Sequence, residues 1–232
     1  MIKIENSVLL SPEQWMAIIL GIRNAMNSWD KSDSEIKYEN VRDSEGYLEM
    51  GPNDHAFMIK LRNAGTDHRK FMRMITVYVD ITAPLYWWQE FDKHKVGVIP
   101  SFYSIKQNIA EKEFEFDDFS HEKLIKSVYM GTQEQHIRTS PIQSLAITIE
   151  CLNSYRDLYL KTTGKKYLWQ IIQLLPNSYN WKHTVMLSYE DLTNIYKSCR
   201  KYPLDEWRKL CTWIEELPYS ELITGEEINR KD

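Results

Sequence analysis

The sequence contains a cationic cluster, Lys93-His94-Lys95, at the end of an aromatic segment that opens at Ala83-Pro84. A strand pattern precedes this segment and a helix pattern fills it, so the cluster is predicted to lie at a helix end. Positive charge at such a place could bind the phosphate groups of a nucleotide-type ligand. In the alternative interpretation, Lys93 and Lys95 are solvated cations favoured by the helix dipole, and His94 has a structural role.

Two adjacent aromatic residues, Trp87 and Trp88, lie in the same predicted helix. Their rings could stack on a planar base, because aromatic faces bind other rings well. The alternative is packing at a helix-helix or subunit interface, where tryptophan is also enriched.

Other catalytic patterns are missing from the sequence. There is no Ser-His-Asp order, no glycine-rich phosphate loop and no cluster of His and Cys with the spacing of metal ligands, so no metal site is predicted. Four scattered histidines are interpreted as surface or capping residues: His55, His121, His136 and His183. The three cysteines have no close spacing and are predicted to be buried, reduced thiols: Cys151, Cys199 and Cys211.

The overall charge limits the possible partners. The formal net charge is -4 and the pI is about 5.9, which argues against binding of duplex nucleic acid, although a local basic pocket is compatible with it. No apolar run reaches the roughly 20 residues of a membrane span, and the first residues do not resemble a signal peptide. We therefore expect a cytoplasmic protein without a membrane partner.

The elements that position these residues follow from periodicity and capping. Ile75, Val77, Val79 and Ile81 alternate with polar residues and predict a strand over 74–82. A second strand is predicted over 181–188, and a long surface loop over 27–51. Helices are predicted for about fifteen residues from 12 and over 52–65, 85–95, 119–129, 141–162, 169–175, 189–200 and 204–217. We expect one α+β domain over 1–232, with a mixed or antiparallel sheet and flanking helices.

Several motifs occur in the order that is typical of the flavin-dependent thymidylate synthases (ThyX-like proteins). Gly65 and His68 stand where that family turns into its strand, and Lys93-His94-Lys95 occupies the place of its Arg-His-Arg cluster. Further on, Leu175-Pro176 precedes the second predicted strand, Asn194 falls at a family Asn, and Arg200 stands seven residues before Trp207. The chain resembles this family from about Trp15 to Leu217.

The resemblance implies a homotetramer whose active sites lie between subunits and bind FAD and dUMP. It implies that reduced flavin passes a hydride and that methylenetetrahydrofolate supplies the methylene carbon. Arg200 matches the Arg that contacts the pyrimidine and is the catalytic candidate. The cofactor-binding candidates are His68, Lys93, His94, Lys95 and Asn194, and the substrate-binding candidates are Ser101, Ser104, Ser188 and Arg200.

The sequence departs from the family at many ligand positions. Where the family has Ser, Asn, Glu, Ser and Arg, this chain has Val98, Pro100, Ser101, Tyr103 and Ile105, and a shift of one residue lets Ser104 restore one hydroxyl. Apolar groups at such positions would leave a phosphate without partners. Further substitutions replace family arginines by Ile172 and Glu190, a family Asn by Ser188, and a small hydroxyl residue and a Glu by Lys70 and Arg73.

Two functions are consistent with these observations. The first is a diverged protein that is unable to make dTMP and that retains a partial nucleotide or phosphate site, or serves as a protein-binding scaffold. The alternative is an active FAD-dependent thymidylate synthase that methylates dUMP to dTMP. The chain also resembles bacteriophage proteins that share its Ala-Pro-Leu-Tyr-Trp-Trp stretch, which implies a host cytoplasm and a host protein as partner.

Overall fold

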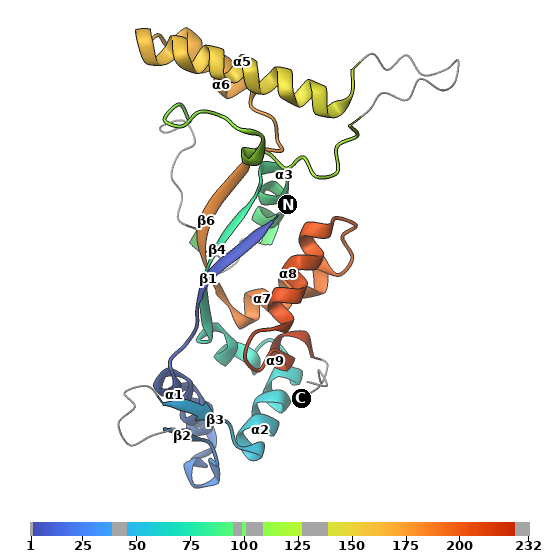
Figure 1. Cartoon of the computed structure of the whole chain (residues 1–232). Helices are drawn as coiled ribbons and strands as arrows, with labels where there is room; N and C mark the ends of the chain where they lie inside the picture. The colour runs from blue at the N-terminus through green and yellow to red at the C-terminus, as the bar shows by residue number, and fades with distance from the viewer. Residues whose placement is uncertain (1, 39–45, 95–98, 101–108, 127–138, 226–232) are drawn as a thin grey trace, which may run out of the picture. The chain divides into compact units, whose positions relative to one another are not determined.

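The computed structural model describes residues 2–38, 46–94, 99–100, 109–126 and 139–225 (Figure 1). Its elements group into two compact units. Unit 1 consists of Met1–Lys3, Thr82–Asp92 and Ser101–His183, and unit 2 of Ile4–Ile81, Lys93–Pro100 and Thr184–Asp232. The expectation of one domain over the whole chain stays a prediction.

A sheet of four strands has the order β1-β4-β6-β5. Its strands are β1 (Lys3–Val8), β4 (Thr76–Pro84), β5 (Ile99–Pro100) and β6 (Asn180–Ser188). β5 runs antiparallel to β6, with Ile99 opposite Met186. The two predicted strands are confirmed as β4 and β6, and the α+β fold class is confirmed with them; β1 and β5 were not predicted.

Unit 2 contains four of the helices that were predicted from capping and periodicity: α1, α2, α7 and α8. Ser11 caps α1 (Pro12–Arg23), and its side chain accepts a hydrogen bond from the Gln14 backbone N–H. Helix α7 packs against α8, α9 and the 3-10 helix η3. The bounds of the remaining helices are α2 (Pro52–Asn63), η3 (Arg69–Arg73), η4 (Asp92–His94), α7 (Tyr189–Cys199), α8 (Asp205–Glu215) and α9 (Glu221–Thr224).

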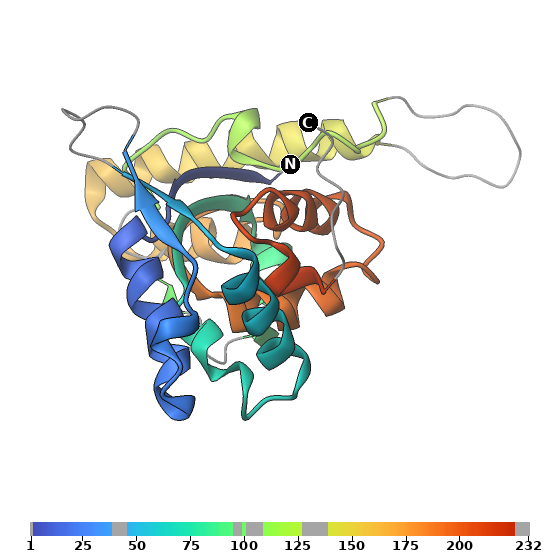
Figure 2. The same cartoon turned by 90° about the horizontal axis from the view of Figure 1, so that it is seen from below.

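The segment 27–51, expected to be a loop, contains a short hairpin. Strands β2 (Glu35–Lys37) and β3 (Tyr47–Glu49) pair antiparallel, with Ile36 opposite Leu48. The hairpin lies beside α1, as Figure 2 shows. Two short 3-10 turns, η1 (Asn24–Met26) and η2 (Trp29–Lys31), lead into it. Strands of three residues are too short to show a period of two, which is why the sequence pattern did not indicate them.

Unit 1 contains two helices that lie side by side, α5 (Pro141–Thr162) and α6 (Lys165–Leu174) (Figure 1). Its other elements are α3 (Leu85–Phe91) and the 3-10 helix η5 (Phe116–Asp118). The expected helix over 119–129 is wrong across its described residues. Phe119 forms a bridge with Tyr179, and the Ser120 N–H donates to the Ser178 carbonyl at 2.7 Å. These backbone groups pair with the chain before β6 because Phe119 is buried in the core of the unit.

The two tryptophans of α3 are packing residues within unit 1. Trp87 is fully buried and its ring stacks on Phe91 with centroids 4.8 Å apart. Trp88 donates from Nε1 to the Trp181 carbonyl at 3.0 Å, and its ring lies 4.6 Å from that of His183. His183 is therefore a core residue of β6, and its interpretation as a surface or capping residue is wrong.

The remaining histidines lie in different settings. His121 contacts the Phe119 carbonyl through Nδ1 at 2.8 Å, and His55 Nε2 lies 2.7 Å from Glu221 Oε1. His136 lies outside the described residues.

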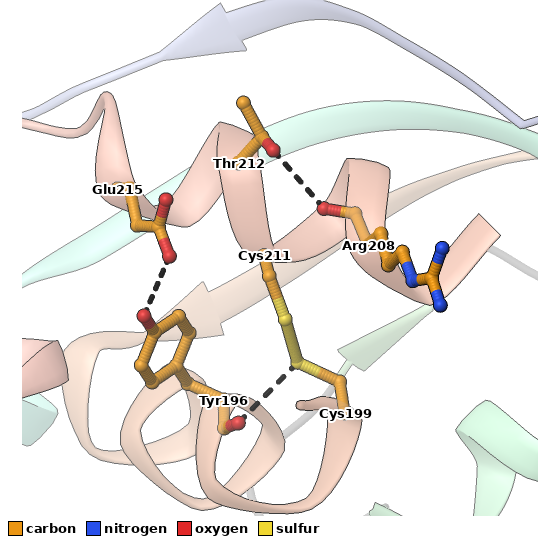
Figure 3. The surroundings of a disulfide bond; sticks show 6 residues. All are labelled: Tyr196, Cys199, Arg208, Cys211, Thr212 and Glu215. Atoms are coloured by element: carbon orange, nitrogen blue, oxygen red, sulfur yellow. Dashed lines mark hydrogen bonds between the residues drawn. A yellow bond between two sulfur atoms is a disulfide. The ribbon is translucent and has the colours of Figure 1, made fainter. Parts of the chain in front are cut away.

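A disulfide joins Cys199 at the end of α7 to Cys211 in α8, with Cα atoms 6.9 Å apart (Figure 3). The prediction of reduced thiols at these two positions is therefore wrong. The cysteines are 12 residues apart in the sequence, and only the reversal of the chain between α7 and α8 brings them together. Beside the disulfide, the Tyr196 hydroxyl donates to Glu215 Oε1 at 2.5 Å. Cys151 is free and partly exposed.

Within the described part of the chain, no helix is long and apolar enough to cross a membrane. The same residues include no group of three or more His, Cys, Asp or Glu side chains that could hold a metal ion.

Candidate functional site

A cavity of about 470 Å³ lies within unit 2. It is formed where η3, the start of β4, the end of β6 and the first turns of α7 come together. Its volume is in the range of small-molecule sites. The lining residues are mostly polar or charged: Thr66, Arg69, Arg73, Thr76, Met186, Ser188, Glu190, Asp191 and Asn194.

Glu190 contacts both arginines of the cavity. Arg69 Nε donates to Glu190 Oε1 at 3.3 Å, and Arg73 Nε donates to Glu190 Oε2. The side chains of Glu190 and Arg69 are 10% and 15% exposed, whereas that of Arg73 is 59% exposed and forms the solvent side of the group. Arg69 therefore lies on the inner side of the group and Arg73 on its outer side.

These ion pairs shift the pKa values of Glu190 and Arg73. Burial disfavours the charged form of Glu190, but the hydrogen bonds and charges of Arg73 and Arg69 outweigh it, so the pKa of the Glu190 carboxyl lies below its ordinary value. The hydrogen bond to Glu190 is the main reason why the pKa of the Arg73 guanidinium is raised. Both shifts favour the charged forms of Glu190 and Arg73.

The start of α7 places the two acidic residues at the cavity. Ser188 is the N-cap, and its side chain accepts from the Asp191 N–H at 3.2 Å. In return, Asp191 Oδ2 accepts from the Ser188 N–H at 2.9 Å and from its hydroxyl at 2.5 Å. This capping box fixes the first turn of the helix, and acidic side chains are favoured there by the helix dipole.

The formal charges in the cavity cancel, because two guanidinium groups face two carboxylates. By the resemblance, a Glu is expected at position 73 and an Arg at position 190. Both signs are reversed here, and the two side chains contact each other. The two substitutions therefore leave the summed charge of positions 73 and 190 unchanged, while the positive and the negative side chain exchange places.

The predicted site residues do not all come together. Ser188 and Asn194 line the cavity, and His68 is exposed at the residue just before η3. Arg200 lies at the other end of α7, about 15 Å from Glu190 by the rise of an α-helix. Its guanidinium lies 5.5 Å from the ring centroid of Tyr196.

The cationic cluster is described only in part. Lys93 is exposed and His94 half-buried in η4, and the His94 ring lies 6.0 Å from that of Trp207. Lys95, Ser101 and Ser104 lie outside the described residues. None of these five residues is among those that line the cavity as described.

Sequence reasoning missed four polar residues of the cavity: Thr66, Arg69, Thr76 and Asp191. One signal was available, since Arg69 and Arg73 lie four residues apart directly before the predicted strand over 74–82. Their shared partner was not visible, because Glu190 follows Arg69 by 121 residues.

Comparisons with known proteins identify the fold. No protein-family model and no curated protein sequence matches the chain. A crystal structure of thymidylate synthase X (ThyX) from Helicobacter pylori with FAD and dUMP is similar over 97% of both chains, with a TM-score of 0.58 and 14% identity. A structure of PolB, a UMP/dUMP methylase from Streptomyces cacaoi bound with 5-Br UMP, covers 97% of this chain and 94% of its own, with a TM-score of 0.59 and 13% identity. The chain therefore has a ThyX-like fold, as its sequence resemblance predicted.

Proposed function

We propose that this chain is a diverged ThyX-like protein that does not make dTMP and that binds a phosphorylated ligand of mononucleotide size in the cavity. The observation that carries the proposal is the state of the two arginines. In the part of the chain that the structure describes, Arg69 and Arg73 each use only Nε in a hydrogen bond, with Glu190. Their Nη groups are left to bind phosphate oxygens, and the contacts with Glu190 orient both guanidinium groups.

FAD fits the cavity less well than a mononucleotide does. The similar ThyX structure contains FAD and dUMP. FAD consists of two nucleotide-sized halves, while a volume of about 470 Å³ is in the lower part of the range for a single small ligand. Glu190 also stands where the resemblance implies an Arg next to a nucleotide site. Ser188 and Asn194 would hold part of such a cofactor by hydrogen bonds, and FAD, if bound, would supply hydride transfer.

The substitutions argue against thymidylate synthesis. Loss of one preorganised contact to a transition state typically lowers the rate by a hundredfold or more. Here Ile172 and Glu190 stand at positions for which the resemblance implies arginine. Self-association into a homo-oligomer, a phage origin, a cytoplasmic location and a host protein partner stay predictions.

The test has a catalytic arm and a binding arm. The purified chain is incubated with dUMP, methylenetetrahydrofolate, FAD and NADPH, and we expect no dTMP. Binding of UMP and AMP is measured by titration calorimetry, and we expect saturable binding that Arg69→Gln weakens by about 10- to 100-fold, the usual value of a charge-assisted hydrogen bond. Arg208→Gln, at a side chain that is 72% exposed on α8, is the matched control and leaves binding unchanged.

Two results would contradict the proposal. One is formation of dTMP in the assay with dUMP, methylenetetrahydrofolate, FAD and NADPH. The other is the absence of binding by any mononucleotide at millimolar concentration.

A further inference from the structure

The cavity contains hydrogen-bond acceptors that the surrounding protein does not use. Asp191 is 7% exposed, and both of its hydrogen bonds from Ser188 go to Oδ2. Among the described residues, no hydrogen bond reaches its Oδ1. A carboxylate has about four acceptor positions, so half of this group is available to a ligand.

Glu190 has spare capacity as well. Each of its oxygens accepts one N–H, from Arg69 or from Arg73, which leaves further acceptor positions on both. Thr66 and Thr76 also line the cavity, and within the described residues neither hydroxyl donates to the two carboxylates. The arginines and the two carboxylates with unused acceptor positions therefore line the same cavity.

A ligand that matches this cavity must combine an anion with hydrogen-bond donors. A phosphate satisfies the arginine Nη groups, and each unused acceptor position of the carboxylates can accept a hydrogen bond from a ligand donor. A bound cation is a poorer match for the carboxylates, because two guanidinium groups already contact Glu190 and no three-residue metal cluster occurs in the described chain. Sugar hydroxyls are uncharged donors, and acidic side chains bind the ribose 2′-hydroxyl in other nucleotide sites.

We infer that the cavity selects ribonucleotides over 2′-deoxyribonucleotides, with the phosphate at Arg69 and Arg73 and the ribose hydroxyls at Asp191 and Glu190. This inference rests on the proposed function and makes it more specific. The expected ligand of this chain carries a ribose, whereas dUMP, which is present in the similar ThyX structure, carries a 2′-deoxyribose. Loss of one hydrogen bond from a hydroxyl to a charged acceptor weakens binding about 10- to 100-fold.

The experiment compares matched pairs of ligands on the full-length chain. Dissociation constants of UMP and dUMP, and of AMP and dAMP, are measured by titration calorimetry; two bases are used because the inference concerns the sugar. We expect each ribonucleotide to bind at least 10-fold more tightly than its deoxy partner. Equal affinities within both pairs would overturn the inference and leave the proposed function standing, whereas no binding of any of the four would overturn the proposed function itself.

Variants then test whether Asp191 and Glu190 cause the preference for ribonucleotides. Asp191→Asn and Glu190→Gln replace acceptors by amides and are expected to lower the ratio of deoxy to ribo dissociation constants toward one. Glu216→Gln, at an exposed position at the end of α8, is the control and keeps the wild-type ratio. A ratio that both cavity variants leave unchanged would overturn the assignment. Asp191 also caps α7, so thermal melting curves are recorded to check that each variant is folded. If Asp191→Asn does not fold, the ratio of deoxy to ribo dissociation constants of the wild-type protein tests the inference.

Discussion

Asp54 provides the strongest single prediction about stability. It is fully buried in α2 and accepts hydrogen bonds from Arg23 Nε at 2.6 Å, from the hydroxyls of Ser32 and Ser34 at 2.8 and 2.7 Å, and from the backbone N–H groups of Asp33 and Ser34 at 3.0 Å. Arg23 is itself only 5% exposed. One carboxylate therefore joins α1, α2 and the chain that leads into the β2–β3 hairpin.

The change Asp54→Asn keeps the shape of the side chain but leaves Arg23 as a buried charge without a counter-ion. Removal of one partner from a buried ion pair costs about 3–5 kcal/mol, which for a chain of this length corresponds to about 6–20 °C in Tm. The measurement is urea and thermal unfolding followed by tryptophan fluorescence. The control is Asp30→Asn, at an exposed position in η2, and we expect it to lie within about 0.5 kcal/mol of wild type.

The pH dependence of stability gives a second readout of the same group. Burial opposes ionisation of Asp54, but the hydrogen bonds from Ser34, Ser32 and Arg23 outweigh it and hold the pKa of the carboxyl below its ordinary value. Its contribution to stability is therefore complete above the unfolded-state pKa of about 3.9 and is lost as the pH falls through the lower folded-state pKa. Wild type should lose more stability than Asp54→Asn over this acid range. If the variant unfolds at the wild-type urea concentration, the reasoning about this network is refuted.

The remaining predictions concern the disulfide and two glycines. Thiol titration of unfolded, unreduced protein should find one thiol, that of Cys151, and three thiols before reduction would contradict the pairing. Reduction of the Cys199–Cys211 bond should lower the free energy of unfolding by about 3 kcal/mol, as expected for a loop of this size. Gly21→Ala, inside α1 with nothing within 4 Å of the added Cβ, should raise the free energy of unfolding by about 0.5–1 kcal/mol. Gly65→Ala has the same free space but a φ of +110°, so it should lower that free energy by about 1 kcal/mol or more; chemical denaturation of both variants checks the opposite signs.

The periodicity of apolar residues predicted the strands and helices that have one buried and one exposed side. In β4, Val77, Val79 and Ile81 are buried, and the period of two is visible in the sequence. In α8, Trp207, Leu210 and Ile214 are buried at helical spacing. Strand β1 escaped prediction because most of its residues are exposed, so no apolar face marks it.

Long-range pairing explains what sequence reasoning missed at the site. The contact of Arg73 with Glu190 spans 117 residues, and the two substitutions were recognised separately, as an unexpected cation and a reversed charge. Only the fold shows that each compensates the other. In the same way, Arg200 and Asn194 lie on one helix and were predicted to serve one site, but six residues of helix place them about 9 Å apart along its axis.

The location of a bound nucleotide tests the central claim most directly. A crystal structure of the protein with UMP would show where the phosphate binds. We predict that its oxygens lie within hydrogen-bond distance of the Arg69 and Arg73 guanidinium groups, with the ribose at Asp191. A phosphate found instead beside Lys93 or Arg200, with the cavity at Glu190 free of ligand, would contradict the account.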